Sequence, residues 1–405
     1  MLSEVIQHYL ESGDFNGLPI RAGDARGDAA EALIRDGLVE VIDEEEFPNP
    51  HIRPWSGRRS VEEQVVVLRA ATEEGSFGVC LYPTASALAD LDEVQALADR
   101  PYTQRLAAGS GQLDVAFFRM DVLESYRNDP RFTFVFDDVA ARAAVSDAVY
   151  ENERETKADK VSIRLGFAYL DASGDGEPIV RFVAAFLRDL AQLSPEHQRR
   201  WETYEVQADC LKAHPIWLAE AFGHWIDRIG PFDALFAELT ALDELFTRAF
   251  GVSLLSTTER PPEFGWMLRP SQMEFDTFVQ TLDKLLSENL RHDAFDAAGI
   301  DLRDEHGQTI GTLNRLDRFL ERAAVPEEQR RELMKPFRVV RAARSKPAHA
   351  LRQNISDSDF IRRQAELLRD VTESVEALRR FLQTHPRNRE WEPPAVLVTA
   401  KRLWL

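Results

Sequence analysis

The chain has 405 residues, 44% of them hydrophobic, and this length and apolar content exclude a disordered protein and predict two or three folded domains. Two cysteines are too few for a disulfide scaffold, and without a signal peptide or a continuous apolar stretch of about 18 residues we expect a cytoplasmic protein that does not enter a membrane. The net charge of -20 disfavours nucleic acid as a partner of most of the chain, but residues 301–405 carry 21 basic and 16 acidic side chains and form the region where a polyanion could bind.

Residues 1–58 are predicted to form a small, helix-rich unit. It begins with an amphipathic segment, turns at Phe15-Asn-Gly-Leu-Pro-Ile20, and continues with a helix over Asp28–Leu38 and a short apolar strand that ends at Ile42. A turn-forming stretch rich in proline closes the unit just before His51. We expect His51 to be a polar residue packed at a domain boundary rather than a site residue.

Residues 59–260 are predicted to form an α+β domain, because helical and strand-like segments alternate along them. Short buried strands are expected at residues 78–82 and 115–118, and the alternation of phenylalanines over residues 132–136 predicts a third. Apolar residues at every second position of residues 161–169, resumed at residue 179, predict a β-hairpin. Its turn is similar to the first half of a calcium loop, but Phe182 stands where a bidentate glutamate is needed, so no metal is expected there.

Residues 265–385 are predicted to form an all-helical bundle, followed by a tail over residues 386–405. Ser271 and Glu274 are predicted to form a capping box. In it the serine hydroxyl accepts a hydrogen bond from the backbone N–H of Glu274, and the glutamate carboxylate accepts one from the backbone N–H of Ser271. Apolar residues at helical spacing predict a first helix after this box, a second through Leu320 and a third that begins after Pro326. The fourth, over residues 359–383, suits a bundle or a dimer interface. The predicted fold class is α+β, with a mixed α/β region before the bundle.

The most informative motif is Arg344 and His349, which are separated by four residues at the end of the third helix. An arginine that neutralises a phosphate and a histidine that moves a proton near neutral pH are sufficient to cleave RNA without a metal. The same spacing recurs at Arg380 and His385, where basic residues simply suit a helix C-terminus. Only the first pair encloses a proline, Pro347, which predicts a helix break that lets the two side chains converge.

Residues 265–385 resemble the HEPN superfamily, the four-helix domains of prokaryotic toxins, defence systems and some eukaryotic RNases. The resemblance rests on the Arg344-x4-His349 motif late in the third helix, on the polar loop of residues 352–358 and on the long amphipathic closing helix. It implies a metal-independent endoribonuclease that needs no cofactor. It also implies that RNA is the substrate and that a homodimer forms through the helical domain, with two motifs facing one another.

Carried over by position, the resemblance assigns roles to individual residues. Arg344 would bind and stabilise the scissile phosphate, and His349 would act as general acid or base. Ser345, Lys346 and Arg341 are the candidate supporting residues. Ser345 departs from the family, which often has Asn, Asp or His at this position, although a serine can still donate a hydrogen bond.

Two other functions stay open from the residues alone. In the first, the helical domain is a non-catalytic dimerisation or ligand-binding module, in which Arg344 pairs with a bundle carboxylate or holds an anion or an acidic partner. In the second, the chain is an accessory subunit of a defence complex. Residues 1–260 resemble only uncharacterised bacterial proteins that share the FNGLPI segment, and they could receive a trigger from a partner protein or a small molecule.

Overall fold

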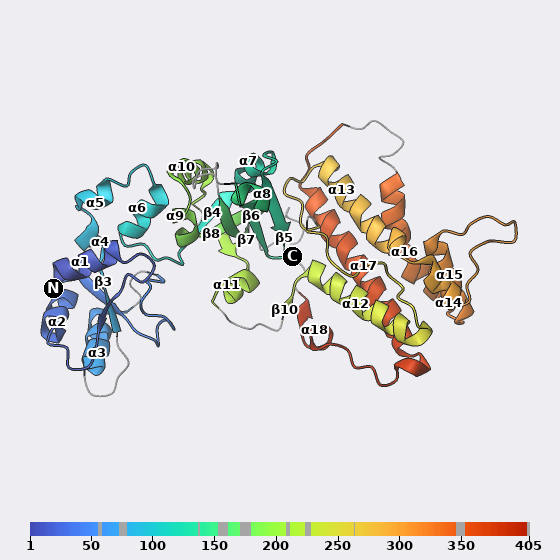
Figure 1. Cartoon of the computed structure of the whole chain (residues 1–405), viewed down its shortest axis with the longest axis horizontal. Helices are drawn as coiled ribbons and strands as arrows, with labels where there is room; N and C mark the ends of the chain where they lie inside the picture. Colours follow the sequence, from blue (N-terminus) through green and yellow to red (C-terminus); the bar gives the residue numbers. More distant parts are fainter. Residues whose placement is uncertain are drawn as a thin grey trace. The chain divides into compact units, whose positions relative to one another are not determined.

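The computed structural model describes residues 1–55, 59–72, 79–136, 138–152, 161–170, 180–207, 211–222, 228–262, 264–345 and 353–402. These residues divide into two compact units (Figure 1). The first unit takes its described residues from Met1–Thr133, Ala143–Ala168 and Phe182–Leu211, and the second from Phe134–Arg142, Tyr169–Arg181 and Lys212–Leu405. Sheets occupy the N-terminal half and helices dominate the C-terminal region, so the predicted α+β class is confirmed.

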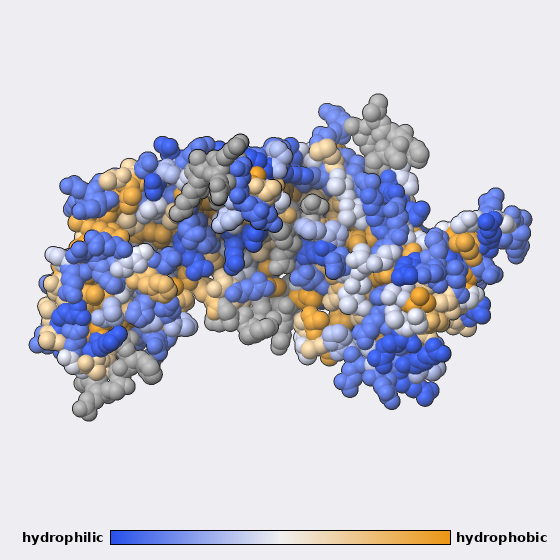
Figure 2. All heavy atoms as spheres, viewed as in Figure 1, coloured by the Kyte–Doolittle hydropathy of each residue, from blue (hydrophilic) through white to orange (hydrophobic). Residues whose placement is uncertain are grey.

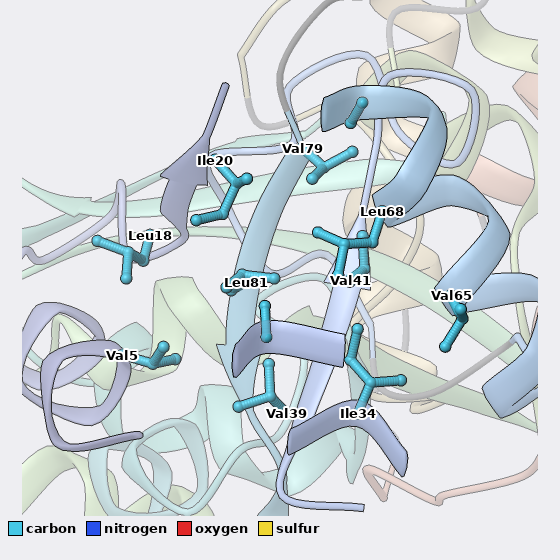
Figure 3. Packing of buried hydrophobic residues seen from close by; sticks show 12 residues of the cluster. Val5, Leu18, Ile20, Ile34, Val39, Val41, Val65, Leu68, Val79 and Leu81 are labelled. Atoms are coloured by element: carbon cyan, nitrogen blue, oxygen red, sulfur yellow. The ribbon is translucent and has the colours of Figure 1, made fainter. Parts of the chain in front are cut away.

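The first unit begins with a small antiparallel sheet in the strand order β1-β3-β2. Val5, Ile34 and Leu68 reach this sheet from three helices and share a buried core with strand residues such as Leu81 (Figure 3). The predicted helix after residue 28 and the strand ending at Ile42 are confirmed. The elements are α1 (Leu2–Glu11), β1 (Leu18–Ile20), α2 (Gly27–Arg35), β2 (Val39–Ile42), α3 (Val61–Thr72) and β3 (Val79–Pro83).

A second sheet has six strands among the described residues, in the order β4-β8-β7-β6-β5, with β9 beside β7. The strands expected near residues 115 and 132 are present, and β7 and β8 are neighbours, as the hairpin prediction requires. The turn expected at Asp171–Gly176 lies outside the described residues. The strands are β4 (Val115–Arg119), β5 (Phe132–Phe136), β6 (Ala140–Val145), β7 (Ser162–Leu170), β8 (Arg181–Phe186) and β9 (Leu211–Ala213).

Short helices accompany these strands, and buried polar contacts fix several of them. Gln198 is fully buried, and its amide bonds to Thr103 of α6 and to main-chain oxygens near α9, which ties three helices together. The helices are α4 (Ala85–Leu88), α5 (Asp92–Gln95), α6 (Pro101–Ala107), η1 (Met120–Leu123), α7 (Glu124–Arg127), α8 (Asp147–Tyr150), α9 (Leu187–Ala191), α10 (Pro195–Tyr204) and α11 (Pro215–Ala221).

The second unit is built on long helices that pack on one another. Helix α12, which precedes the predicted start of the bundle at residue 265, packs along α17, while α16 packs against α13, α15 and α17 (Figure 1). Helix α16 begins at Glu327, as predicted. The elements are β10 (Arg228–Ile229), α12 (Pro231–Phe250), α13 (Gln272–Asp283), η3 (Lys284–Glu288), α14 (His292–Ala297), α15 (Thr312–Arg322), α16 (Glu327–Ser345), α17 (Asp359–Gln383), η5 (Pro386–Asn388), α18 (Ala395–Val398) and β11 (Lys401–Arg402).

The capping box at the start of α13 forms only in part. The Ser271 hydroxyl accepts from the Glu274 backbone N–H, as predicted. The Glu274 carboxylate, however, accepts from the backbone N–H of Arg269 at 3.1 Å instead of from Ser271. The Ser271 N–H already donates to the Arg269 carbonyl at 2.8 Å, so the glutamate satisfies a different donor of the preceding loop.

A buried charge network joins α12, α17 and β11. Glu238 of α12 is fully buried and accepts hydrogen bonds from Arg379 at 2.5 Å and from Arg402 at 2.6 Å. Glu376 accepts a second bond from Arg402 at 2.7 Å. Buried charges need such partners, and this network therefore fixes the register of α12 against α17 and holds β11 near them.

Candidate functional site

Arg344 lies in the last described turn of α16, one turn beyond a stripe of buried residues. Met334, Phe337 and Val340 of that stripe face the core, and Arg344 continues it with a side chain that is 34% exposed. Arg344 thus lies at the inner edge of its helix, where a charged side chain needs a partner.

Two carboxylates, one at the end of α13 and one at the end of η3, meet the Arg344 guanidinium. Its Nη1 atom donates to Asp283 Oδ2 at 2.5 Å and lies 3.0 Å from Glu288 Oε1. Asp283 is 1% exposed, whereas Glu288 is 53% exposed. One partner is thus part of the core, and the other lies at the rim.

A π-helical turn explains how both carboxylates reach one nitrogen. Residues five apart on an α-helix are rotated from one another by about 140°. The η3 turn, however, makes wider hydrogen bonds, including one from the Asn289 N–H to the Lys284 carbonyl at 2.9 Å. This winding carries Glu288 back towards the face of Asp283. Single π turns of this kind are frequent at functional sites.

The contacts of Arg344 leave one edge of its guanidinium available. The shortest contact of each carboxylate is to Nη1, and neither Nε nor Nη2 donates a hydrogen bond to a described residue. The hydrogen bond to Asp283 raises the pKa of Arg344 above its ordinary value, so the group stays charged. A guanidinium edge with two parallel N–H donors matches two oxygens of a phosphate or carboxylate.

Charge limits what this edge can bind. Two carboxylates face one guanidinium, and the second oxygen of Asp283, Oδ1, is buried without a donor among the described residues. An anion that approaches Arg344 therefore meets the negative field of Glu288 first. Because Glu288 is exposed, it can move into solvent, whereas Asp283 cannot.

Of the other predicted site residues, Arg341 and Ser345 are described in the structure. Arg341 and Ser345 are exposed on α16, and the Ser345 hydroxyl donates to the Arg341 carbonyl at 3.0 Å, a bond within the helix. Lys346 and His349 lie outside the described residues, together with Pro347. The approach of His349 to Arg344 therefore stays a prediction.

The second pair with the same spacing has a different environment. Arg380 pairs with Glu376 one turn earlier on its own helix, and its side chain is 70% exposed. His385 lies beyond α17, where its ring accepts from the Arg387 N–H at 3.3 Å and caps η5. These are helix-end contacts, as the sequence indicates.

Asp283 and Glu288 were not singled out from the sequence. The sequence does contain a signal that Asp283 is partly buried, because this residue directly follows Leu282 and so lies at the edge of the apolar stripe of its helix. An acidic residue there and an arginine on the stripe of another helix form a natural pair. No comparable signal exists for Glu288, because its position depends on the π turn.

No protein-family model matches the chain, and neither a curated protein nor a solved structure matches it. Within the part of the chain that the structure describes, no helix has both the length and the apolar character that a membrane span requires. Cys80 is buried, as expected of an apolar filler, and burial raises its pKa to about 12. Cys210 lies outside the described residues.

Proposed function

We propose that the chain is a metal-independent endoribonuclease in which Arg344 binds the scissile phosphate and His349 transfers protons. The observation that supports this most is the Nε–Nη2 edge of Arg344, which makes no hydrogen bond to a described residue, on a guanidinium that Asp283 holds from the other side. A side chain with a fixed orientation and an available bidentate edge loses little entropy when it binds a phosphate.

The proposed reaction follows from these groups. The 2'-hydroxyl of a ribose attacks its own phosphate, a base takes the hydroxyl proton, and an acid protonates the leaving 5'-oxygen. Arg344 stabilises the charge that develops on the phosphate oxygens. His349 is the candidate for the proton transfers, and a second copy in a homodimer would supply the complementary acid or base.

The proposal extends to the biological role. The net positive charge of residues 301–405 suits an RNA substrate, whereas the acidic first 300 residues suit a restraining or sensing part. A toxin or an antiviral-defence effector, kept inactive until triggered, combines these two properties.

One observation favours a second candidate function. Arg344 already contacts two carboxylates, which is the arrangement of a structural ion pair in a dimerisation or ligand-binding module. In that case Arg344 holds α16 against the end of α13, and the chain cleaves no RNA.

A cleavage assay with matched variants separates the two functions. End-labelled RNA is incubated with the full-length protein in EDTA, and we expect fragments with 2',3'-cyclic phosphate or 3'-phosphate ends. His349→Ala is expected to lower the rate by about 10²–10⁴-fold without changing the melting temperature. Arg380→Ala and His385→Ala are the matched controls, because they alter the second arginine–histidine pair with the same spacing. We expect both variants to cleave RNA at the wild-type rate.

The outcome is decisive in either direction. Cleavage by His349→Ala at the wild-type rate, or loss of cleavage in the Arg380 and His385 variants, would contradict the proposed site. No cleavage by the wild type or by any variant would support the interaction module.

A further inference from the structure

The first unit contains a cavity of about 880 Å³ that the proposed nuclease chemistry does not use. Its walls come from α1, the loop before β1, the region of α5 and α6, and α9. Ligand sites in proteins have volumes of roughly 300–1,000 Å³ and combine apolar walls with a few polar groups. This cavity has both properties.

The apolar walls come from partly buried residues at the edge of the core. On α1, Val5 and Tyr9 are buried, while Ile6 and Leu10 are only partly buried and line the cavity. Leu106 of α6 contributes from another side. On the face shown in Figure 2, hydrophobic residues are visible around α5 and α6. Apolar surface left open in this way is available to a ligand.

The walls are braced by hydrogen bonds within the protein. The Tyr9 hydroxyl donates to the Leu106 carbonyl at 2.5 Å and joins α1 to α6. The Gln112 side-chain amide donates to the Asp14 carbonyl at 3.1 Å and holds the loop after α1. A cavity braced in this way exists before a ligand arrives, which lowers the entropic cost of binding.

Asn16 of the FNGLPI segment is, like Gln112, a buried polar residue that lines this cavity. The Asn16 side chain is part of the wall, and its amide oxygen, Oδ1, has no hydrogen-bond donor among the described residues. An unsatisfied buried acceptor is costly, and a donor from a bound molecule would satisfy it once the amide turns towards the cavity. The segment thus has a polar group, the Oδ1 atom of Asn16, that no described residue satisfies.

Close packing of the next residue fixes the place of Asn16. A Cβ atom on Gly17 would lie 2.3 Å from the Tyr82 hydroxyl and 2.7 Å from the Cys80 Cβ, so only glycine fits against β3. The Gly17 N–H donates to the His51 carbonyl at 3.0 Å. Leu18 and Ile20 then enter the core (Figure 3).

Charge selects the class of ligand. The cavity is lined by three carboxylates, on Glu11, Asp14 and Glu93, against one guanidinium, on Arg188. Arg188 is itself opposed by Asp189, whose carboxylate lies 3.5 Å from its Nε. The lining is therefore net negative and rich in hydrogen-bond acceptors, which favours a cation over an anion.

From these features we propose that the cavity binds a small organic cation with an apolar body, whose N–H donors reach Asn16 and the acidic rim. The cavity and all its lining residues belong to the first unit. The proposal is therefore independent of the function proposed for Arg344.

Two dyes of opposite charge test the proposal with the full-length chain. We expect rhodamine 6G, a cationic aromatic dye, to bind saturably by fluorescence anisotropy, and 8-anilinonaphthalene-1-sulfonate, an anionic one, to bind at least tenfold more weakly. Neutralising the rim with Glu11→Gln, Asp14→Asn and Glu93→Gln together should weaken rhodamine binding roughly tenfold. The matched control is the triple variant Asp36→Asn, Glu44→Gln and Glu62→Gln, which removes three exposed charges that do not line the cavity and should bind like wild type.

A second variant locates the site without relying on charge. Ala107→Trp fills the cavity from α6 and is expected to abolish rhodamine binding while the circular dichroism spectrum is retained. If Ala107→Trp unfolds, the rim variant decides, because its three residues are exposed and tolerate substitution. Equal affinity for the two dyes, equal weakening by the control triple, or unchanged binding in a folded Ala107→Trp would each overturn the proposal.

Discussion

The ion pair between Arg344 and Asp283 leads us to expect an asymmetry between two substitutions. Arg344→Ala leaves Asp283, which is 1% exposed, as a buried carboxylate without its arginine. Removing one partner of a buried pair costs roughly 3–5 kcal/mol, and we expect about 3 because Arg344 itself is partly exposed. Asp283→Asn removes the buried charge and leaves Arg344 to Glu288 and solvent, so we expect a loss of only about 1 kcal/mol.

Urea titration of the wild type, the two single variants and the double variant measures these free energies of unfolding. The loss in the double variant is expected to be about 2 kcal/mol smaller than the sum of the two single losses. The reason is that an uncharged amide at position 283 needs no counter-charge once the arginine is gone. Because the chain has two compact units, it need not unfold in a single transition. The free energy of unfolding is therefore taken from the transition that the substitutions shift. Arg341→Ala, an exposed change one turn earlier, is the control and should cost less than about 0.5 kcal/mol. Equal losses in the two single variants, or additive losses in the double variant, would refute the reasoning.

Three further predictions concern other charged groups. Glu288→Gln removes the rim carboxylate that competes with a phosphate for Arg344, so RNA affinity should rise about threefold in a filter-binding titration; a lower affinity would contradict this role. Hydrogen bonds from Arg26 lower the pKa of Asp24 from 3.8 to about 2, and the stabilisation is present above pH 4 and lost as the pH falls through 2. Asp24→Asn should therefore lower the melting temperature at pH 7 but not at pH 2, and an equal loss at both values in scanning calorimetry would argue against it. Glu238→Gln leaves two arginines facing a neutral group at a fully buried position, and we expect a loss of about 3 kcal/mol in urea titration; a change below 1 kcal/mol would show that the network contributes little.

Elements with a long, regular pattern could be predicted from the sequence, and short ones could not. The alternating phenylalanines of β5 and the helical spacing of α13 each repeat often enough to specify one period. The strand β1 has only three residues, with a glycine before it and a proline inside it, and this composition predicts a turn. It is a strand because β3 supplies its hydrogen-bond partners from more than 50 residues away.

The candidate site shows the same division between local and distant causes. The spacing of an arginine and a histidine is a local property and occurs twice, so it cannot by itself distinguish Arg344 from Arg380. Their partners do: Arg380 pairs with an acid of its own helix and stays largely exposed, whereas Arg344 reaches a buried carboxylate 61 residues earlier in the chain. That contact requires the packing of α13 against α16, and the second carboxylate requires the π turn that follows α13. Because a buried charge is retained only where it is paired, Asp283 marks Arg344 as the arginine whose position the fold specifies, under either of the two proposed functions.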